Sequence, residues 1–205
     1  MSYTAGVDIG STYTKSIVVN GDGVIVGSAI NPTGFRLTEI AATTLDEAAR
    51  AAGVTRDDLA YVAATGFGRH QATVSDVQVT DLTASARGVH HLFPNTKTIL
   101  DVGGQTMKAS RVDEAAKVKS FRLNDKCAAG TGAFLEKTAR YMGYSTAEIG
   151  PLVDTSKASV PISGVCAVFA ESEVINHVSQ GAAPGDIMHG AMASLIEKSV
   201  RLMKR

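Results

Sequence analysis

The sequence has little from which a charged or aromatic binding surface could be built. It contains no tryptophan and only 5% aromatic residues, and its 205 positions hold 20 basic and 20 acidic residues. Nucleic acids and anionic membranes are bound largely through basic charge, and single strands also through stacked aromatic rings. The composition therefore argues against a nucleic acid or a membrane as partner.

The chain also lacks an apolar run long enough to cross a bilayer, and its first residues show no basic stretch followed by an apolar one. We therefore expect a cytoplasmic protein. Structural disulfides are rare in that compartment, so the two cysteines, Cys127 and Cys166, call for another explanation. The simplest alternative is that both are ordinary buried residues.

Complete versions of the common nucleotide motifs are missing as well. The stretch Gly10–Ser16 resembles a P-loop but has no glycine immediately before Lys15, and Ile9 stands where the first glycine is required. The stretch Gly130–Leu135 begins like a dinucleotide fingerprint but lacks the third glycine. Neither template applies.

Two short phrases that are present are near-copies of each other: Val7–Ser11 (VDIGS) and Leu100–Gly104 (LDVGG). Each follows an apolar run that is typical of a strand, and each places an aspartate beside a glycine-containing turn. Glycine lets backbone amides approach a phosphate closely, and aspartate can hold Mg²⁺ directly or through water. One copy alone indicates only a turn with a capping aspartate, but two copies in matching contexts predict a duplicated phosphate and Mg²⁺ site.

The first turn and a nearby lysine are expected to bind the β-phosphate, and the second turn the γ-phosphate. The catalytic candidates are Asp8 and Asp101, which would orient Mg²⁺ and its waters, and Gln105, which would face the γ-phosphate. The predicted residues are Asp8, Gly10, Ser11, Thr12, Lys15, Asp101, Gly103, Gly104 and Gln105.

The order of predicted elements indicates an α/β protein. Both halves show a strand, hairpin strands and then helices, whereas a doubly wound dinucleotide-binding unit places a helix directly after the phosphate turn. We therefore predict two ribonuclease-H-like lobes around a nucleotide cleft, residues 1–95 and 96–205. The segment Ser194–Lys204 is amphipathic and has no C-cap, so a further segment is expected beyond Arg205.

Both cysteines precede or open apolar helical patterns, Cys127 within 124–132 and Cys166 within 163–171. The start of a helix favours a thiolate, which is the form that binds metals. A 4Fe–4S cluster usually takes four thiolates, and one chain offers two. No histidine has the spacing of a shared zinc ligand, so the count closes most simply if two subunits share one cluster.

At these residues the chain resembles a known family, the activators of 2-hydroxyacyl-CoA dehydratases and the ATPase subunits of benzoyl-CoA reductases. The matching phrases are DIGST from Asp8, DVGGQ from Asp101, NDKCAAGTG from Asn124 and VFAESEVI from Val168. The resemblance covers essentially the whole chain. It places the protein in the superfamily of actin, heat-shock chaperone ATPases, and acetate and sugar kinases.

The resemblance implies two actin-like lobes that bind ATP and Mg²⁺, with further nucleotide contacts from Gly130, Thr131 and Gly132. It implies one 4Fe–4S cluster per dimer, held by Cys127 and Cys166 of each subunit. The second subunit would be identical or paralogous. ATP hydrolysis would drive a low-potential electron from a ferredoxin or flavodoxin to an acyl-CoA reductase or dehydratase.

Two other functions stay open at this point. A phosphotransferase of the same superfamily would need a carboxylate base aimed at a substrate hydroxyl, and no motif supplies one. A non-catalytic nucleotide-dependent switch would leave both cysteine phrases without a role.

The resemblance also implies a further segment, because family members usually continue past the point that matches Arg205 with residues that contact the adenosine.

Overall fold

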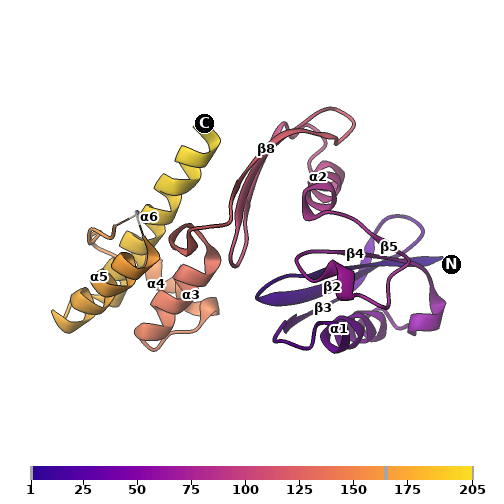
Figure 1. The fold of residues 1–205 in the computed structure, drawn as a ribbon. Coiled ribbons are helices and arrows are strands. Elements are labelled where there is room, and N and C mark those ends of the chain that lie inside the picture. The colour runs from indigo at the N-terminus through magenta and orange to yellow at the C-terminus, as the bar shows by residue number, and fades with distance from the viewer. Residues whose placement is uncertain (1, 164–165, 205) are drawn as a thin grey trace. The chain divides into compact units, whose positions relative to one another are not determined.

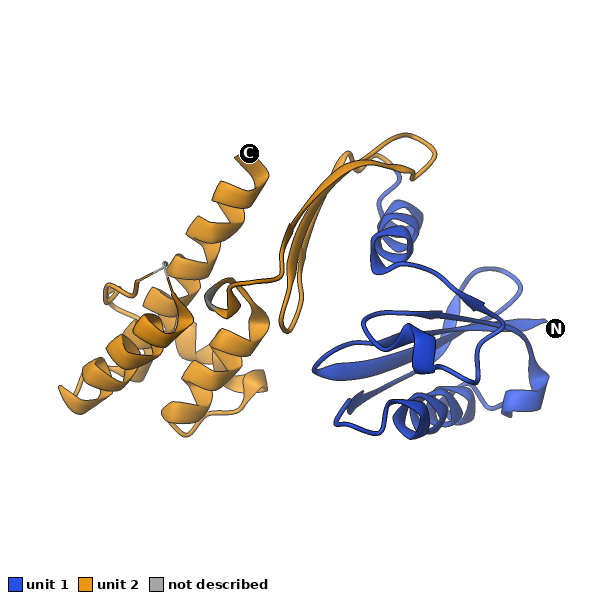
Figure 2. Cartoon of the chain, in the orientation of Figure 1, with its two compact units in different colours: residues 1–94 blue, residues 95–205 orange. Residues whose placement is uncertain are grey.

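The computed structural model describes residues 2–163 and 166–204, and the chain divides into two compact units, residues 1–94 and 95–205 (Figure 2). The predicted lobes, residues 1–95 and 96–205, are each expected to be half of a nucleotide-binding ATPase. That each unit serves as half of a nucleotide-binding ATPase stays a prediction.

The first unit is built on one mixed five-stranded sheet, in the order β3-β2-β1-β4-β5 (Figure 1). Strands β1, β2 and β3 are antiparallel neighbours, while β4 runs parallel to both β1 and β5. The elements are β1 (Tyr3–Ile9), β2 (Tyr13–Val19), β3 (Ile25–Pro32), α1 (Leu37–Ala51), η1 (Arg56–Asp58), β4 (Leu59–Thr65), η2 (Arg69–Gln71), β5 (Val77–Gln78) and α2 (Asp81–Leu92).

Alternating side chains decide which face of this sheet is covered. Val7 and Ile9 of β1 are buried in the same core as Leu45 of helix α1, as period-two burial in a strand requires. At Gly27 of β3 a Cβ atom would lie 2.2 Å from the carbonyl oxygen of Ala48, so only glycine lets α1 approach this closely. The mixed sheet with helix α1 on one face confirms the α/β prediction, and the hairpin directly after β1 distinguishes this unit from a doubly wound one.

Sequence signals predict one helix end of the first unit and miss another. The helical pattern from Leu37 to Ala52 predicts a stop at Gly53, and Gly53 follows the C-cap Ala52 with φ +73°. Asp81 before the pattern that runs to His91 predicts a cap at that residue, but Thr80 is the N-cap, and its Oγ1 accepts the amide of Thr83 at 3.2 Å. Both residues are good capping types, and the neighbouring threonine occupies the position.

The second unit combines a three-stranded antiparallel sheet, in the order β6-β7-β8, with helices that follow it in the chain (Figure 1). Its core gathers Phe134, Leu152, Ala170, Met188 and other side chains from four helices. The elements are β6 (Thr98–Val102), β7 (Met107–Val112), β8 (Val118–Asn124), η3 (Ala128–Gly130), α3 (Gly132–Tyr141), η4 (Thr146–Glu148), α4 (Ile149–Asp154), α5 (Ala167–Ser179) and α6 (Pro184–Lys204).

Helix α4 is the element that the sequence pattern did not predict. It spans only six residues and contains Gly150 and Pro151 near its start, where both types usually signal a loop. Proline is nevertheless tolerated in the first turn of a helix, because the amide there has no intrahelical partner. The sequence pattern predicts a last helix from about Pro184 to Arg205, which agrees with α6 up to Lys204, and Arg205 lies outside the described residues.

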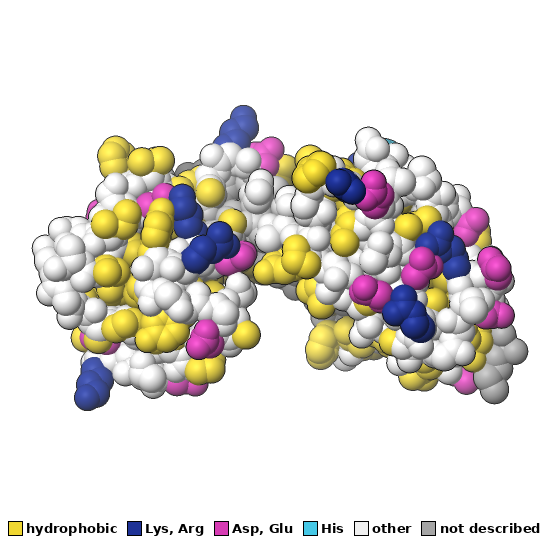
Figure 3. Space-filling view, turned by 90° about the horizontal axis from the view of Figure 1, so that it is seen from below, with side chains coloured by type: hydrophobic (Ala, Val, Ile, Leu, Met, Phe, Trp, Pro, Cys, Tyr) yellow, Lys and Arg dark blue, Asp and Glu magenta, His cyan; other side chains and the backbone are white. Residues whose placement is uncertain are grey.

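Charged side chains of both signs are interspersed with apolar ones on the face drawn in Figure 3, as expected for equal numbers of acidic and basic residues. None of the helices in the described ranges is long and apolar enough to cross a membrane.

Candidate functional site: two Asp–Gly hairpins and two cysteines

The first predicted phosphate turn lies at the tip of the β1–β2 hairpin. Asp8 at the end of β1 pairs in register with Lys15 of β2, and Lys15 Nζ lies 2.9 Å from Asp8 Oδ2. The amide of Gly10 donates to the carbonyl of Tyr13 at 3.1 Å, which closes the turn. A Cβ on Gly10 would come within 2.7 Å of that carbonyl oxygen. The turn therefore needs glycine at this position.

Two neighbouring segments fix this first turn. Thr33 donates from Oγ1 to the carbonyl of Gly10 at 2.8 Å, and Thr33 and Thr14 lie 3.0 Å apart at their buried hydroxyls. On the other side, Gly66 adopts φ +89°, and a Cβ there would lie 2.3 Å from Asp8 Oδ1. The carboxylate of Asp8 is thus held against the turn after β4, while Lys15 stays exposed.

The second predicted turn has the same construction in the other unit. Asp101 of β6 pairs in register with Lys108 of β7, and their charged atoms are 3.6 Å apart. The amide of Gly103 donates to the carbonyl of Thr106 at 2.8 Å. Gln105 is exposed at the tip of this hairpin.

The second turn is connected by hydrogen bonds to the start of helix α3. The amide of Gly132 donates to the carbonyl of Gly103, and the amide of Ala133 donates to the carbonyl of Gly104, both at 2.9 Å. These amides are among those that a helix leaves unpaired at its N-terminus. Gly132 also leaves room for the approach, since a Cβ there would lie 3.3 Å from the carbonyl oxygen of Gly103. The predicted phosphate turn and the predicted glycine-rich loop are therefore one hydrogen-bonded assembly.

Cys127 begins the loop that leads into this assembly. It is half-buried, forms no disulfide and is the N-cap of the three-residue turn η3 rather than of a full helix. Asn124 donates from Nδ2 to its carbonyl at 3.2 Å, and Lys198 of α6 donates from Nζ to its Sγ at 3.2 Å. Thr131 closes η3 by donating from Oγ1 to the carbonyl of Ala128 at 2.6 Å.

Cys166 is the N-cap of helix α5, as the sequence predicted. It is half-buried and free, and its carbonyl accepts the amide of Ala170 at 3.0 Å in the first helical turn. Residues 164 and 165 of the predicted phrase lie outside the described residues. The setting is that of a thiol beside the positive end of a thirteen-residue helix.

Side chains of α5 hold the segment that precedes Cys166. Glu173 accepts a short hydrogen bond from the amide of Ser163, and His177 donates from Nε2 to the carbonyl of Pro161 at 3.1 Å. These two residues lie four positions apart and therefore share a face of the helix. The segment consequently folds back along α5 before the chain reaches the cysteine.

Further polar contacts connect this region to its surroundings. Glu171 of α5 pairs with Lys137 of α3 at 2.7 Å, and the hydrogen bond from this carboxylate raises the pKa of Lys137. Asp186 of α6 accepts the amides of Ala158 and Lys157, which lower the pKa of its carboxyl. For Glu171 and Glu173 in the first turns of α5, the sequence leaves two interpretations open: partners of the helix dipole, or residues that couple the cluster to the nucleotide. Glu171 contacts α3, the helix next to the second turn, and Glu173 contacts the segment before Cys166.

Among the described residues, no group of three or more histidine, cysteine or carboxylate side chains is arranged around a point that could hold a metal ion. The predicted nucleotide residues fall into two sets, one in each hairpin, and the second set lies in the same unit as both cysteines. Their roles toward ATP and metal stay predictions.

Comparisons with known proteins identify the family to which the chain belongs. The chain belongs to the BadF/BadG/BcrA/BcrD ATPase family, whose model matches residues 5–205. It is 38% identical to the 2-hydroxyisocaproyl-CoA dehydratase activator of Clostridioides difficile, over 99% of this chain and 76% of that protein. It is 36% identical to a subunit of the benzoyl-CoA reductase of Thauera aromatica, over 100% of this chain and 73% of that protein.

A solved structure agrees with the sequence relationship. The activator of the 2-hydroxyisocaproyl-CoA dehydratase from Clostridium difficile, solved with bound ADPNP, matches with a TM-score of 0.92 and 38% identity. The match covers 99% of this chain and 75% of that one. The predicted family and the actin-like ATPase fold are therefore confirmed.

Sequence reasoning did not assign a role to three residues that the structure places beside the predicted ones: Lys108, His177 and Lys198. Lys108 had a signal, because it follows Asp101 by seven positions just as Lys15 follows Asp8. Lys198 had none, since it lies 71 positions from Cys127.

Proposed function

We propose that this chain is the ATP-hydrolysing subunit of a cytoplasmic electron-transfer system that reduces an acyl-CoA-processing enzyme. The partner is a 2-hydroxyacyl-CoA dehydratase or a benzoyl-CoA reductase component, since relatives of both kinds cover nearly the whole chain at similar identity. The solved relative with a bound ATP analogue supports ATP as the nucleotide.

The first hairpin is proposed to hold the β-phosphate and the second the γ-phosphate of Mg·ATP. Backbone amides at the turns approach the phosphates, and the two paired lysines supply positive charge. Asp8 and Asp101 position Mg²⁺ and its waters, and Gln105 at the exposed tip orients the attacking water. Hydrolysis of ATP by water then gives ADP and phosphate.

Cys127 and Cys166 of each of two chains are proposed to hold one shared 4Fe–4S cluster. The two half-buried thiols per chain form no disulfide and supply half of a four-thiolate set. When bound, the cluster supplies a one-electron centre that a ferredoxin or flavodoxin reduces and the acyl-CoA enzyme oxidises. The second chain is an identical or a paralogous subunit.

The observation that carries this proposal is the hydrogen bonding between the second turn and helix α3. The carbonyls of Gly103 and Gly104 accept the amides of Gly132 and Ala133, and Cys127 lies five positions before Gly132. A change of the phosphate bound at this turn therefore has a short covalent and hydrogen-bonded path to a cluster ligand. Such coupling is what distinguishes an ATP-driven electron donor from a simple ATPase.

The test is anaerobic purification and cluster reconstitution, followed by iron and sulfide analysis. Electron paramagnetic resonance spectra of the dithionite-reduced protein are recorded with and without Mg·ATP. We expect about four irons per two chains and a spectrum that changes when ATP is added. Cys166→Ser is the matched variant, and it should lose the iron while ATP binding to the subunit is retained. A wild-type protein that stays colourless after reconstitution, or equal loss of ATP binding in the variant, would contradict the proposal.

A further inference from the structure

One lysine reaches the sulfur of Cys127 from a distant part of the chain. Lys198 lies near the end of helix α6, and its Nζ donates to Cys127 Sγ at 3.2 Å. Its neighbours Leu195 and Ser199 are buried, so this part of the helix backbone is packed against the rest of the second unit. The ammonium group is therefore held at the sulfur by the fold of that unit.

The loop around Cys127 is shaped to admit this side chain. Gly130 is buried, and a Cβ there would lie 3.1 Å from Lys198 Cδ and 3.3 Å from Asn124 Nδ2. The aliphatic stem of the lysine thus packs across the glycine while its charged end contacts the sulfur, as long basic side chains commonly do. Asn124 holds the same loop through the carbonyl of Cys127.

The two cysteines of one chain differ in this respect. Among the residues that the structure describes, none donates a side-chain hydrogen bond to Cys166 Sγ, although Cys166 is exposed to a similar degree. Cys127 therefore has a charged donor at its sulfur, whereas Cys166 has the amides of a helix start nearby.

We propose that Lys198 sets the reduction potential of the iron–sulfur centre through its hydrogen bond to Cys127. This inference rests on the proposed function, because it assumes that Cys127 is a cluster ligand. One-electron reduction adds a negative charge to the centre, and a donor to a ligand sulfur stabilises the more negative state. Lys198 acts through Cys127, so it is a positioning residue that raises the potential.

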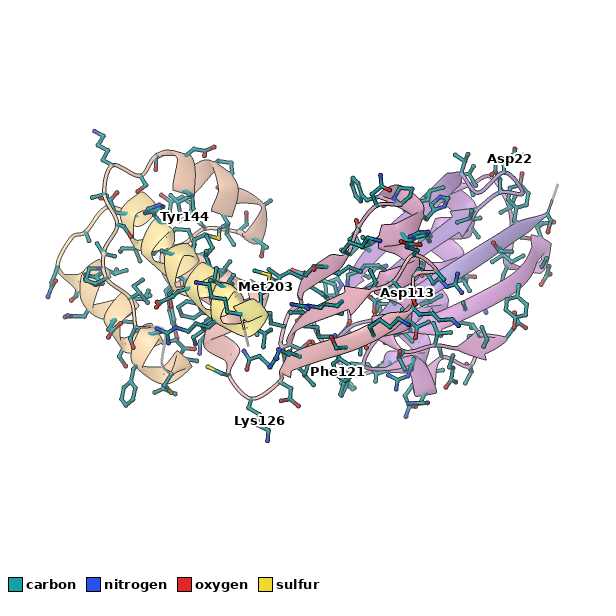
Figure 4. All side chains as sticks on the ribbon, turned by 90° about the horizontal axis from the view of Figure 1, so that it is seen from above. Asp22, Asp113, Phe121, Lys126, Tyr144 and Met203 are labelled. Atoms are coloured by element: carbon teal, nitrogen blue, oxygen red, sulfur yellow. The ribbon has the colours of Figure 1, made fainter. Side chains whose placement is uncertain are left out.

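The test compares Lys198→Met with Lys126→Met in the reconstituted protein, using a redox titration followed by electron paramagnetic resonance in the absence of ATP. Lys126 directly precedes Cys127 in the chain, and its exposed side chain points away from the protein (Figure 4). Its removal deletes the same charge one residue from the ligand without deleting the contact to sulfur. Iron content is measured for every variant.

Lys198→Met is expected to shift the reduction equilibrium about tenfold toward the oxidised state, which is about 59 mV more negative for one electron. Lys126→Met should stay within the error of the wild type, and Lys198→Arg should keep most of the wild-type potential because it retains a charged donor. Gly130→Ala tests the same contact in another way. It should also make the potential more negative, because the added methyl group displaces the aliphatic stem of Lys198.

Each outcome bears on a different claim. Equal shifts in Lys198→Met and Lys126→Met, or no shift in Lys198→Met, would overturn the inference while leaving the cluster proposal intact. If Lys198→Met binds no iron, a wild-type potential in iron-loaded Gly130→Ala would overturn it. A wild-type protein without any cluster would overturn the proposed function and this inference with it.

Discussion

The two Asp–Gly hairpins are built alike but are held by different neighbours. In each, an aspartate faces a lysine seven positions later, and the turn glycine donates its amide to a carbonyl three positions on. In the first unit the carbonyl of Gly10 accepts the hydroxyl of Thr33, whose partner Thr14 is buried in the sheet. In the second unit the carbonyl of Gly103 accepts the amide of Gly132 at the start of α3.

The difference predicts different roles for the two turns. The first turn is hydrogen-bonded to the buried Thr33, which pairs with Thr14 of its own sheet, so we expect it to hold a phosphate in a constant position. The second is hydrogen-bonded to the start of α3, which follows Cys127, so we expect movement of this turn to displace the cysteine loop. If both copies bind phosphate as proposed, the first would hold its phosphate in place and the second would transmit a change of its phosphate to Cys127.

The largest expected effect comes from adding a methyl group at the turn glycines. A Cβ would meet the facing carbonyl oxygen at 2.7 Å in Gly10→Ala but at 3.1 Å in Gly103→Ala. We expect Gly10→Ala to cost about 2 kcal/mol of ATP binding, or roughly thirtyfold in affinity, because the backbone must move. Gly103→Ala should cost about tenfold or less. Calorimetric titration with a non-hydrolysable ATP analogue measures both.

The same pair of variants tests the different roles of the two turns. At saturating Mg·ATP, Gly10→Ala should keep the ATP-dependent change in the electron paramagnetic resonance spectrum. Gly103→Ala should weaken that change, since it displaces the acceptor of the Gly132 amide. If both variants respond to ATP as the wild type does, the second turn does not transmit to Cys127.

The sequence predicted the hairpins well because their signals are local. The strand before each aspartate, the glycine turn and the returning strand all lie within about a dozen consecutive residues, and alternation decides the register. The predicted cysteine at the start of α5 is also local, since Cys166 directly precedes an apolar helical pattern. In such segments the pattern and the fold agree.

The long-range contacts of the first turn and of Cys127 could not be predicted in this way. Thr33 reaches Gly10 across 23 positions, and Lys198 reaches Cys127 across 71. No periodicity marks either pair, because they meet only after the sheet and the helices have packed. The loop predicted over 124–132 and the helix predicted after it are confirmed, since α3 begins at Gly132, and only the single 3-10 turn within the loop was not predicted.

A smaller effect is expected from removing the paired lysines one at a time. Lys15→Met and Lys108→Met should each lower ATP affinity about tenfold by deleting one positive charge near a phosphate. They should differ in stability, because the side chain of Lys15 is 47% exposed and that of Lys108 only 15%. We expect less than about 0.5 kcal/mol for Lys15→Met and about 1 kcal/mol for Lys108→Met in the free energy of unfolding.

Lys97→Met is the matched control for this comparison. Lys97 forms an exposed ion pair with Glu114 in the second unit, away from the turn, so its removal should leave ATP affinity unchanged. Urea unfolding gives the stabilities, and the same calorimetric titration gives the affinities. Loss of ATP affinity in Lys97→Met as large as in Lys108→Met would mean that the effect is one of overall charge.

The smallest expected effect concerns one acidic side chain in each unit. Amides of Ala158 and Lys157 lower the pKa of Asp186, and the amide and hydroxyl of Thr55 lower that of Asp58. A carboxyl whose pKa is lower in the folded state stabilises the protein above its unfolded pKa, near 3.8, and this contribution disappears as the pH falls through the folded value. Asp186→Ala and Asp58→Ala should therefore both lower the urea midpoint at pH 7, and the gap to the wild type should narrow toward pH 3.

Hydrogen exchange separates the two units in these variants. Asp186→Ala should speed exchange at Lys157 and Ala158, in the segment that leads toward Cys166, while Asp58→Ala should act at Thr55 alone. Because only the first of these segments leads to a proposed cluster ligand, only Asp186→Ala should also hasten iron loss from the reconstituted protein. If both variants lose iron at the wild-type rate, the anchoring of this segment by α6 matters for folding but not for the metal centre. A gap in urea midpoint that persists at pH 3 would instead show that packing, rather than the charged carboxylate, is what Asp186 contributes.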